Sequence, residues 1–204
     1  ADGVYLHIAT NISGRIRVDD TVMAHIDEDR RKNIMRNHSA CHLLQSALRR
    51  VLGSHIEQAG SYVDEARLRF DFTHFAALTP EEISRVEDLV NDEILRGAPG
   101  SMTEMPLDEA QRLGALAFFG EKYGDTVRVV RMGESSVELC GGTHVDNTAK
   151  IGLFKILAES SVAAGVRRIE ATTGKGVLSL ITRERRLLSD AARELKAQNP
   201  SDIV

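Results

Sequence analysis

The sequence predicts an α+β fold in which helices pack on a mostly antiparallel sheet. Three observations predict this class. Some segments place apolar residues at helical spacing, and several short segments alternate apolar and polar residues as strands do. In addition, glycine, proline and aspartate separate these segments as turn signals. With 42% hydrophobic and 27% charged residues among 204, the composition is that of an ordinary globular protein.

The first thirty residues are expected to contain short strands. Residues 4–8 and 15–26 have strand character, with turn signals at Gly14 and at the aspartate pair 19–20. A chain that opens directly in a strand favours a fragment of a longer protein. The sequence also lacks an apolar run near the ~20 residues that span a bilayer. Its start does not resemble a signal peptide, so we expect a cytoplasmic protein.

Two helices are expected in the first half of the chain. Asn37 is predicted to cap a helix that runs to about Leu52, where Gly53 ends it. Its apolar stripe is Leu44, Ala47, Leu48 and Val51. Thr79 is predicted to cap the second helix through a capping box with the glutamate three residues later. The stripe of that helix is Ile83, Val86, Val90 and Ile94.

The remaining segments are expected to be mostly strands. Strand patterns cover residues 67–72, 101–107, 126–132, 136–139, 152–160 and 166–173. Asp108 is predicted to cap a short helix that ends at Gly114, and a charged helix is predicted from about Gly176.

The overall charge does not indicate a nucleic-acid-coating protein. The formal net charge is -4, whereas such proteins are usually basic. RNA contacts would therefore have to come from local basic clusters, for each of which a solvated surface is the more common explanation. The candidates are Arg30, Arg31, Lys32 and Arg36, then Arg49 and Arg50, Arg67 and Arg69, and Arg167 and Arg168.

Two pairs of metal-ligand residues give the strongest functional signal. His38 and His42 are four apart on a predicted helix, so their rings share one face. Cys140 and His144 are also four apart, around two glycines that let the backbone fold tightly. Three imidazoles and one thiolate match tetrahedral zinc ligation. A zinc protease is disfavoured because Ser39 stands where that motif has its glutamate.

Other candidates are less specific. The chain has only two cysteines, and the one outside the two ligand pairs is Cys41. Cys41 is a fifth candidate ligand, a pocket residue beside the metal, or a buried small side chain. A disulfide framework is not expected. Gln58 and Ser61 offer polar groups to a substrate but also suit a turn. The loop that ends in Arg167 and Arg168 fits either a phosphate or a surface turn.

Several motifs together resemble the editing region of bacterial alanyl-tRNA synthetases. They are residues 38–44 (HSACHLL), 69–72 (RFDF), 119–123 (FGEKY), 138–144 (ELCGGTH) and 164–171 (AGVRRIEA). The editing domain of threonyl-tRNA synthetases and the free-standing AlaX proteins share this fold and zinc motif, and the CGGTH form favours the alanyl branch. The resemblance implies three parts: the end of a small β-barrel at 1–30, the editing core at 31–175, and a helical linker to a missing C-terminal domain at 176–204.

The resemblance also implies a function. Members of this family join alanine to tRNA(Ala) with ATP, and their editing domain hydrolyses the ester of tRNA(Ala) mischarged with serine or glycine. It implies Zn²⁺ at His38, His42, Cys140 and His144. It implies a substrate pocket at Cys41, Gln58, Ser61 and Thr143, and contacts to the tRNA end at Arg167 and Arg168. No DNA or membrane partner is expected.

Some alternatives stay open. An open coordination position would let zinc activate a water, whereas four protein ligands would make zinc an organiser of the pocket. No separate catalytic base is evident. Cys41 departs from the family, which usually has threonine there, and a thiol is the weaker hydrogen-bonding group. Rival functions are a free-standing AlaX-type deacylase, a zinc-stabilised tRNA-binding module without catalysis, and an unrelated zinc hydrolase.

Overall fold

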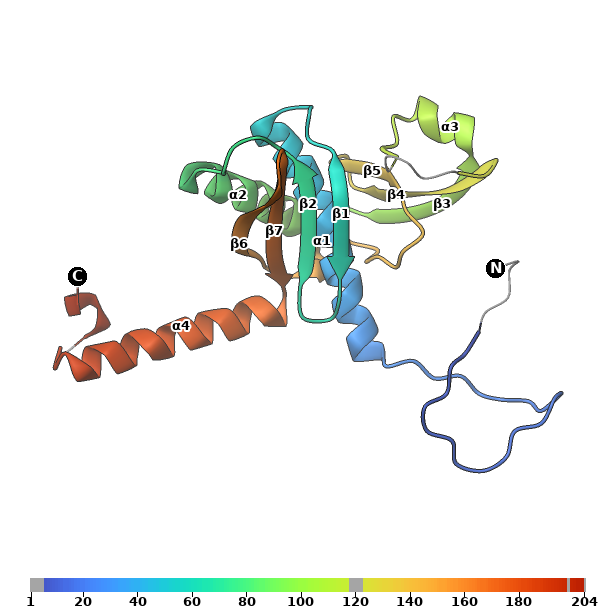
Figure 1. The fold of residues 1–204 in the computed structure, drawn as a ribbon, viewed down its shortest axis with the longest axis horizontal. Coiled ribbons are helices and arrows are strands. Elements are labelled where there is room, and N and C mark those ends of the chain that lie inside the picture. Colours follow the sequence, from blue (N-terminus) through green and yellow to red (C-terminus); the bar gives the residue numbers. More distant parts are fainter. Residues whose placement is uncertain (1–5, 118–122, 198, 204) are drawn as a thin grey trace.

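The computed structural model describes residues 6–117, 123–197 and 199–203, and within them it has the predicted α+β architecture (Figure 1). Two antiparallel sheets are present, and neither closes into a barrel. The helices are α1 (Glu28–Leu52), α2 (Pro80–Arg96), α3 (Leu107–Arg112) and α4 (Lys175–Glu194), with 3₁₀ turns at Thr148–Ile151 and Pro200–Ile203. The strands are β1 (Gln58–Val63), β2 (Leu68–Thr73), β3 (Gly100–Pro106), β4 (Thr126–Met132), β5 (Ser136–Leu139), β6 (Phe154–Ala163) and β7 (Val166–Thr173).

The larger sheet has the strand order β1-β2-β7-β6 and is covered on one face by α1 and α2 (Figure 1). Its core-facing side chains come from alternate positions, with Phe70 of β2 opposite Ile169 of β7. They pack against the apolar stripes of the two helices, and burial of these side chains provides most of the folding free energy.

The smaller sheet has the order β3-β4-β5 and links two cores. Val130 and Met132 of β4 join the main core, whereas Val127 and Val129 join a small cluster under α3. Because β5 pairs with β4, the C-terminal end of β5 lies beside the main core, close to α1. This arrangement carries the second ligand motif to the first.

The second helix forms as predicted. Thr79 accepts a hydrogen bond from Glu82 N, while the Glu82 carboxylate accepts one from Thr79 N, which completes the capping box. Gly97 ends the helix with φ of 64°, a left-handed conformation that glycine adopts without strain.

The first helix begins ten residues before the predicted start, so the prediction of an Asn37 cap is wrong. Asp27 is the cap, and its carboxylate accepts a hydrogen bond from Arg30 N. Asn37 is buried inside the helix instead. Its amide donates to Asp64 O and accepts from Thr173 Oγ1, so it ties α1 to the β1–β2 turn and to β7.

The strand predicted over 15–26 does not form. Residues 6–27 have no helix or strand, and apolar side chains such as Ile8 and Val18 are over 90% exposed. A strand needs a neighbour to hydrogen-bond with, and none lies beside this segment in the described residues. Of the strand predicted over 4–8, only residues 6–8 are described, and they are not in a strand.

Two further differences concern the rest of the chain. Gln58 and Ser61, which also suited a turn, lie in the edge strand β1. The short third helix begins at Leu107, one residue before its predicted cap Asp108.

The last long helix, α4, extends away from the sheets (Figure 1). None of the described helices is both long enough and apolar enough to cross a membrane.

Candidate metal centre

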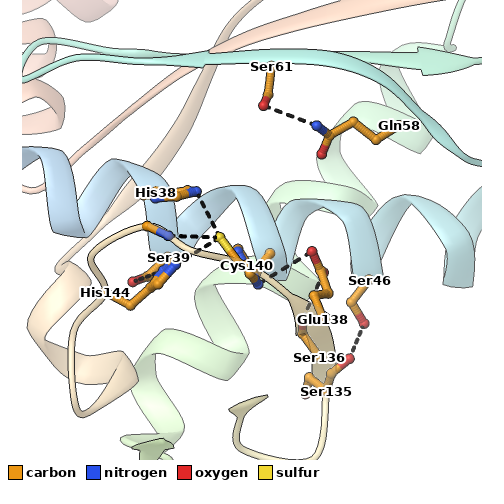
Figure 2. A network of polar contacts seen from close by, with 12 residues as sticks. His38, Ser39, Ser46, Gln58, Ser61, Ser135, Ser136, Glu138, Cys140 and His144 are labelled. Carbon is orange, nitrogen blue, oxygen red and sulfur yellow. Dashed lines mark hydrogen bonds and ion pairs between the residues drawn. The ribbon is translucent and has the colours of Figure 1, made fainter. Parts of the chain in front are cut away.

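The two distant ligand motifs meet in the folded chain. His38 and His42 belong to α1. Cys140 and His144 come from the segment that follows β5 and lie beside His38 (Figure 2). One ligand atom from each residue lies within 4.8 Å of the others, and together the four form a group that could hold a metal ion. The Cys140 sulfur lies 3.5 Å from Nε2 of His38 and 3.4 Å from Nε2 of His144.

The glycine pair between Cys140 and His144 makes this meeting possible. A Cβ atom on Gly142 would overlap the His38 ring, so only glycine fits beside this imidazole. The Gly142 N–H also donates to the Cys140 sulfur at 3.5 Å. In contrast, a Cβ on Gly141 would meet open space. The two glycines therefore contribute differently to the site.

Polar contacts hold the ligand loop in place. The Arg128 guanidinium donates to the carbonyl oxygens of Cys140, at 3.1 Å, and of Gly142. Ser39 Oγ accepts from Val145 N at 3.0 Å and lies 3.3 Å from Nδ1 of His144. Ser39, where a zinc protease has its base, thus positions a ligand.

The buried carboxylate of Glu138 lies behind His42. Its Oε2 is 3.4 Å from His42 Nδ1, and the two side chains are 3% and 2% exposed. The geometry is that of a close polar contact rather than a well-aligned hydrogen bond, since Nδ1 has no hydrogen-bond partner among the described residues. Ser136 donates to Glu138 Oε1 at 2.8 Å. A carboxylate in this position orients a metal-binding imidazole so that Nε2 faces the metal.

The imidazoles are held in the neutral form that binds metals. Burial, together with the nearby His38, lowers the pKa of His42 to about 3. Burial lowers the pKa of His144 to about 2, and the neighbouring His42, His38 and Arg128 act in the same direction. The pKa of His38 is also lowered, first by burial and then by Arg128. Burial raises the pKa of Glu138 to about 8, against the opposing effects of Ser136 and Arg49.

The donor set fits a tetrahedral metal ion. Three imidazole nitrogens and one sulfur, gathered in a mostly buried cluster, are the ligands that zinc prefers. The buried Nδ1 of His42 beside a carboxylate is a further sign, because metal-binding histidines usually have such a partner.

Cys41 lies in the hydrophobic core rather than in the ligand group. It is 5% exposed and packs among apolar residues, while the four-residue group does not include it. Burial, followed by Glu138 and Cys140, raises the pKa of its thiol, so the thiol stays protonated. Both cysteines are free of disulfides.

Three of the predicted pocket residues, Gln58, Ser61 and Thr143, lie in β1 and in the ligand loop. Gln58 and Ser61 point from β1 toward α1 (Figure 2), and Gln58 Nε2 donates to Ser61 Oγ at 3.1 Å. Thr143 is half-buried in the ligand loop, next to His144.

A cavity of about 210 Å³ lies on the Gln58 side of α1. Gln45 and Arg49 of α1, Gln58 of β1 and Glu138 of β5 line it, with Leu116 closing one wall. The sequence predictions missed Gln45 and the role of Glu138. Strand alternation could have indicated Glu138, since residues 136, 138 and 140 share one face. The position of Gln45 three residues after His42 gave a similar helical signal.

A larger groove of about 640 Å³ lies along the N-terminal half of α1, against His144. Its lining is mixed: the basic residues Arg31, Lys32, Arg36 and Lys150, the acidic residues Glu28 and Asp146, and the apolar residues Ile26, Met35 and Val145. Two of these cations have carboxylate partners: Lys32 contacts Glu28 at 3.0 Å and Lys150 contacts Asp146 at 2.6 Å.

The two arginines of β7 are engaged within the sheet. Arg167 contacts Glu159 at 2.5 Å, and Arg168 forms a bidentate pair with Asp71 at 2.7 and 2.8 Å. Their role in RNA binding stays a prediction. Most of the FGEKY motif at 119–123 lies outside the described residues, which resume at Tyr123.

Comparison with known proteins places this geometry in a family. Residues 127–170 match the family described as the threonyl and alanyl tRNA synthetase second additional domain. An alanine–tRNA ligase of Acetivibrio thermocellus is 56% identical over 203 residues, which are 100% of this chain and 23% of the relative. An alanine–tRNA ligase of Bacillus velezensis is 50% identical over 202 residues, which are 99% of this chain and 23% of the relative.

The chain thus spans about a quarter of the length of these relatives. The match covers both ligand motifs and almost every residue between the chain ends, so it does not depend on the His/Cys cluster alone. The chain therefore corresponds to a region of alanyl-tRNA synthetases, about 23% of their length, that contains the second additional domain.

Proposed function

We propose that this region is an editing hydrolase that cleaves the ester of tRNA(Ala) mischarged with serine or glycine and spares the alanine ester. The observation that carries the proposal is the convergence of His38, His42, Cys140 and His144 within 4.8 Å, in a chain related to alanine–tRNA ligases. We further propose that the ion is Zn²⁺, because zinc prefers this donor set.

The chain's own residues position the reacting groups. Glu138 and Ser39 fix the rings of His42 and His144, and Arg128 fixes the loop between the ligands. Bound zinc would supply Lewis acidity at the ester or organise the pocket around it. Holding the ester and a water in a fixed geometry contributes much of the acceleration that an activated ester needs.

The basic groove beside His144 supports access by an RNA end. Arg31, Lys32 and Arg36 line it, and cationic side chains contact phosphates. We propose that the 3′ end of the tRNA approaches along this groove. Arg167 and Arg168 would contribute as carboxylate-held cations at the end of the larger sheet.

The remaining parts of the proposal concern the parent protein. Residues 1–30 would be the end of a small barrel, 31–175 the editing core and 176–204 a linker helix. The other domains would attach alanine to tRNA(Ala) with ATP, in the cytoplasm. These proposals rest on the relatives, of which this chain spans about 23%.

The test combines metal content with hydrolysis. The chain is expected to contain one zinc per molecule and to deacylate Ser-tRNA(Ala) and Gly-tRNA(Ala) but not Ala-tRNA(Ala). His42→Ala is expected to lose metal and hydrolysis together, whereas His55→Ala, at an exposed position outside the cluster, retains both. Hydrolysis by a metal-free His42→Ala variant would reject the zinc-dependent mechanism. Zinc and RNA binding without any hydrolysis would instead indicate a non-catalytic module.

A further inference from the structure

One buried amide oxygen near the metal centre lacks a partner among the described residues. Gln45 lies three residues after His42 on α1 and is only 6% exposed. Its Oε1 atom has no hydrogen-bond partner anywhere in the described parts of the chain. An unpaired buried acceptor costs free energy, so such a group is commonly explained by a bound partner.

Gln45 borders the 210 Å³ cavity and is close to the cluster. Glu138 lines the same cavity and also contacts His42 at 3.4 Å. The cavity therefore reaches within one side chain of a metal ligand. A group bound in it would lie beside the proposed reaction centre and could contact Gln45.

Several other polar side chains of this cavity are already engaged. Gln58 Nε2 donates to Ser61 at 3.1 Å, and Arg49 donates to Ile56 O at 2.6 Å. Glu138 accepts from Ser136 at 2.8 Å. Among the described side chains that line this cavity, Gln45 Oε1 is the buried acceptor without a partner, and it requires a donor. A hydroxyl group can donate one hydrogen bond to such an acceptor.

Building on the proposed function, we propose that Gln45 is a specificity-determining residue that accepts a hydrogen bond from the side-chain hydroxyl of a seryl ester. An alanyl group has no hydroxyl and would leave Oε1 unpaired. A site built to bind a hydroxyl rejects the analogue that lacks it for this reason. Gln45 therefore adds to the selectivity that Cys41, a weak hydrogen-bonding group, supplies poorly.

The test compares two substrates that differ in the hydroxyl. Gln45→Met keeps a similar volume but removes both hydrogen-bonding atoms. We expect kcat/KM for Ser-tRNA(Ala) to fall roughly tenfold, as for the loss of one neutral hydrogen bond. The value for Gly-tRNA(Ala) is expected to stay unchanged. Gln111→Met, the same substitution at an exposed position of α3, is expected to change neither.

Metal content and the melting temperature complete the experiment. Both are expected to be retained in Gln45→Met, since the substitution removes an unpaired buried acceptor. An equal fall on both substrates, no fall on either, or failure to fold would overturn the inference and assign Gln45 a structural role. If the unchanged chain hydrolysed neither substrate, the proposed function would fall, and this inference with it.

Discussion

His42 Nδ1 lies 3.4 Å from Glu138 Oε2, and both side chains are almost completely buried. A carboxyl group in this position directs the other nitrogen of the imidazole toward the ligand cluster. The same carboxylate also lines the adjacent cavity. One residue of β5 thus connects the metal centre with the proposed substrate pocket.

Glu138→Gln is expected to weaken metal binding. The substitution keeps the shape of the side chain but replaces the carboxyl group that faces His42 with an amide. Loss of such a partner typically lowers metal affinity by about 10- to 100-fold. Competition with a chromophoric chelator measures the change. Glu134→Gln, at the exposed β4–β5 turn, is the matched control, and equal affinities of the two variants would contradict this role.

Gly142→Ala is expected to displace His38 and reduce metal affinity, because the added methyl would overlap that imidazole. Gly141→Ala, one residue earlier, adds the same methyl in open space and is expected to bind metal normally. Metal titration of the two variants, with circular dichroism to check folding, makes the comparison. Identical titrations would show that the loop adjusts freely around the ring.

Removal of the metal is expected to destabilise the chain. The ligands connect α1 with the segment after β5, which are about a hundred residues apart, and an ion that binds only the folded state stabilises it. At a free metal concentration 1,000 times Kd, the stabilisation is about 4 kcal/mol. Thermal unfolding with and without chelator should show a lower melting temperature in chelator, and the His42→Ala variant should be insensitive to it.

Cys41→Thr is expected to retain the metal and to keep or sharpen the preference for Ser-tRNA(Ala) over Ala-tRNA(Ala). Cys41 is not in the ligand group, and a hydroxyl is the stronger hydrogen-bonding group. Parallel assays of metal content and of both deacylation rates test this. A folded variant without metal would identify Cys41 as a ligand.

The fold was largely predictable where local signals are strong. β4, β5 and β7 have the predicted bounds, because each alternates apolar and polar residues between turn signals. The α2 capping box is likewise a local feature. The start of α1 was missed because Asn37 is a good cap residue whose side chain instead bonds to Asp64 and Thr173, partners that only the folded chain brings near.

Some residues of the candidate site were likewise predictable from local signals, and others were not. Residue types and four-residue spacing indicated the ligands, since both pairs reflect local geometry. Gln45 and Glu138 escaped notice, because neither is unusual at its sequence position. Their importance arises from burial beside a cavity that α1, β1 and β5 form together.

By itself, the sequence determined the ligand types, their pairing in two motifs and most of the secondary structure, because these depend on neighbours within a few residues. Only the tertiary structure decided that the two motifs converge, that Cys41 packs in the core and that Gln45 remains unpaired. These properties depend on which distant segments exclude water from one another, and the packing of the whole chain sets that.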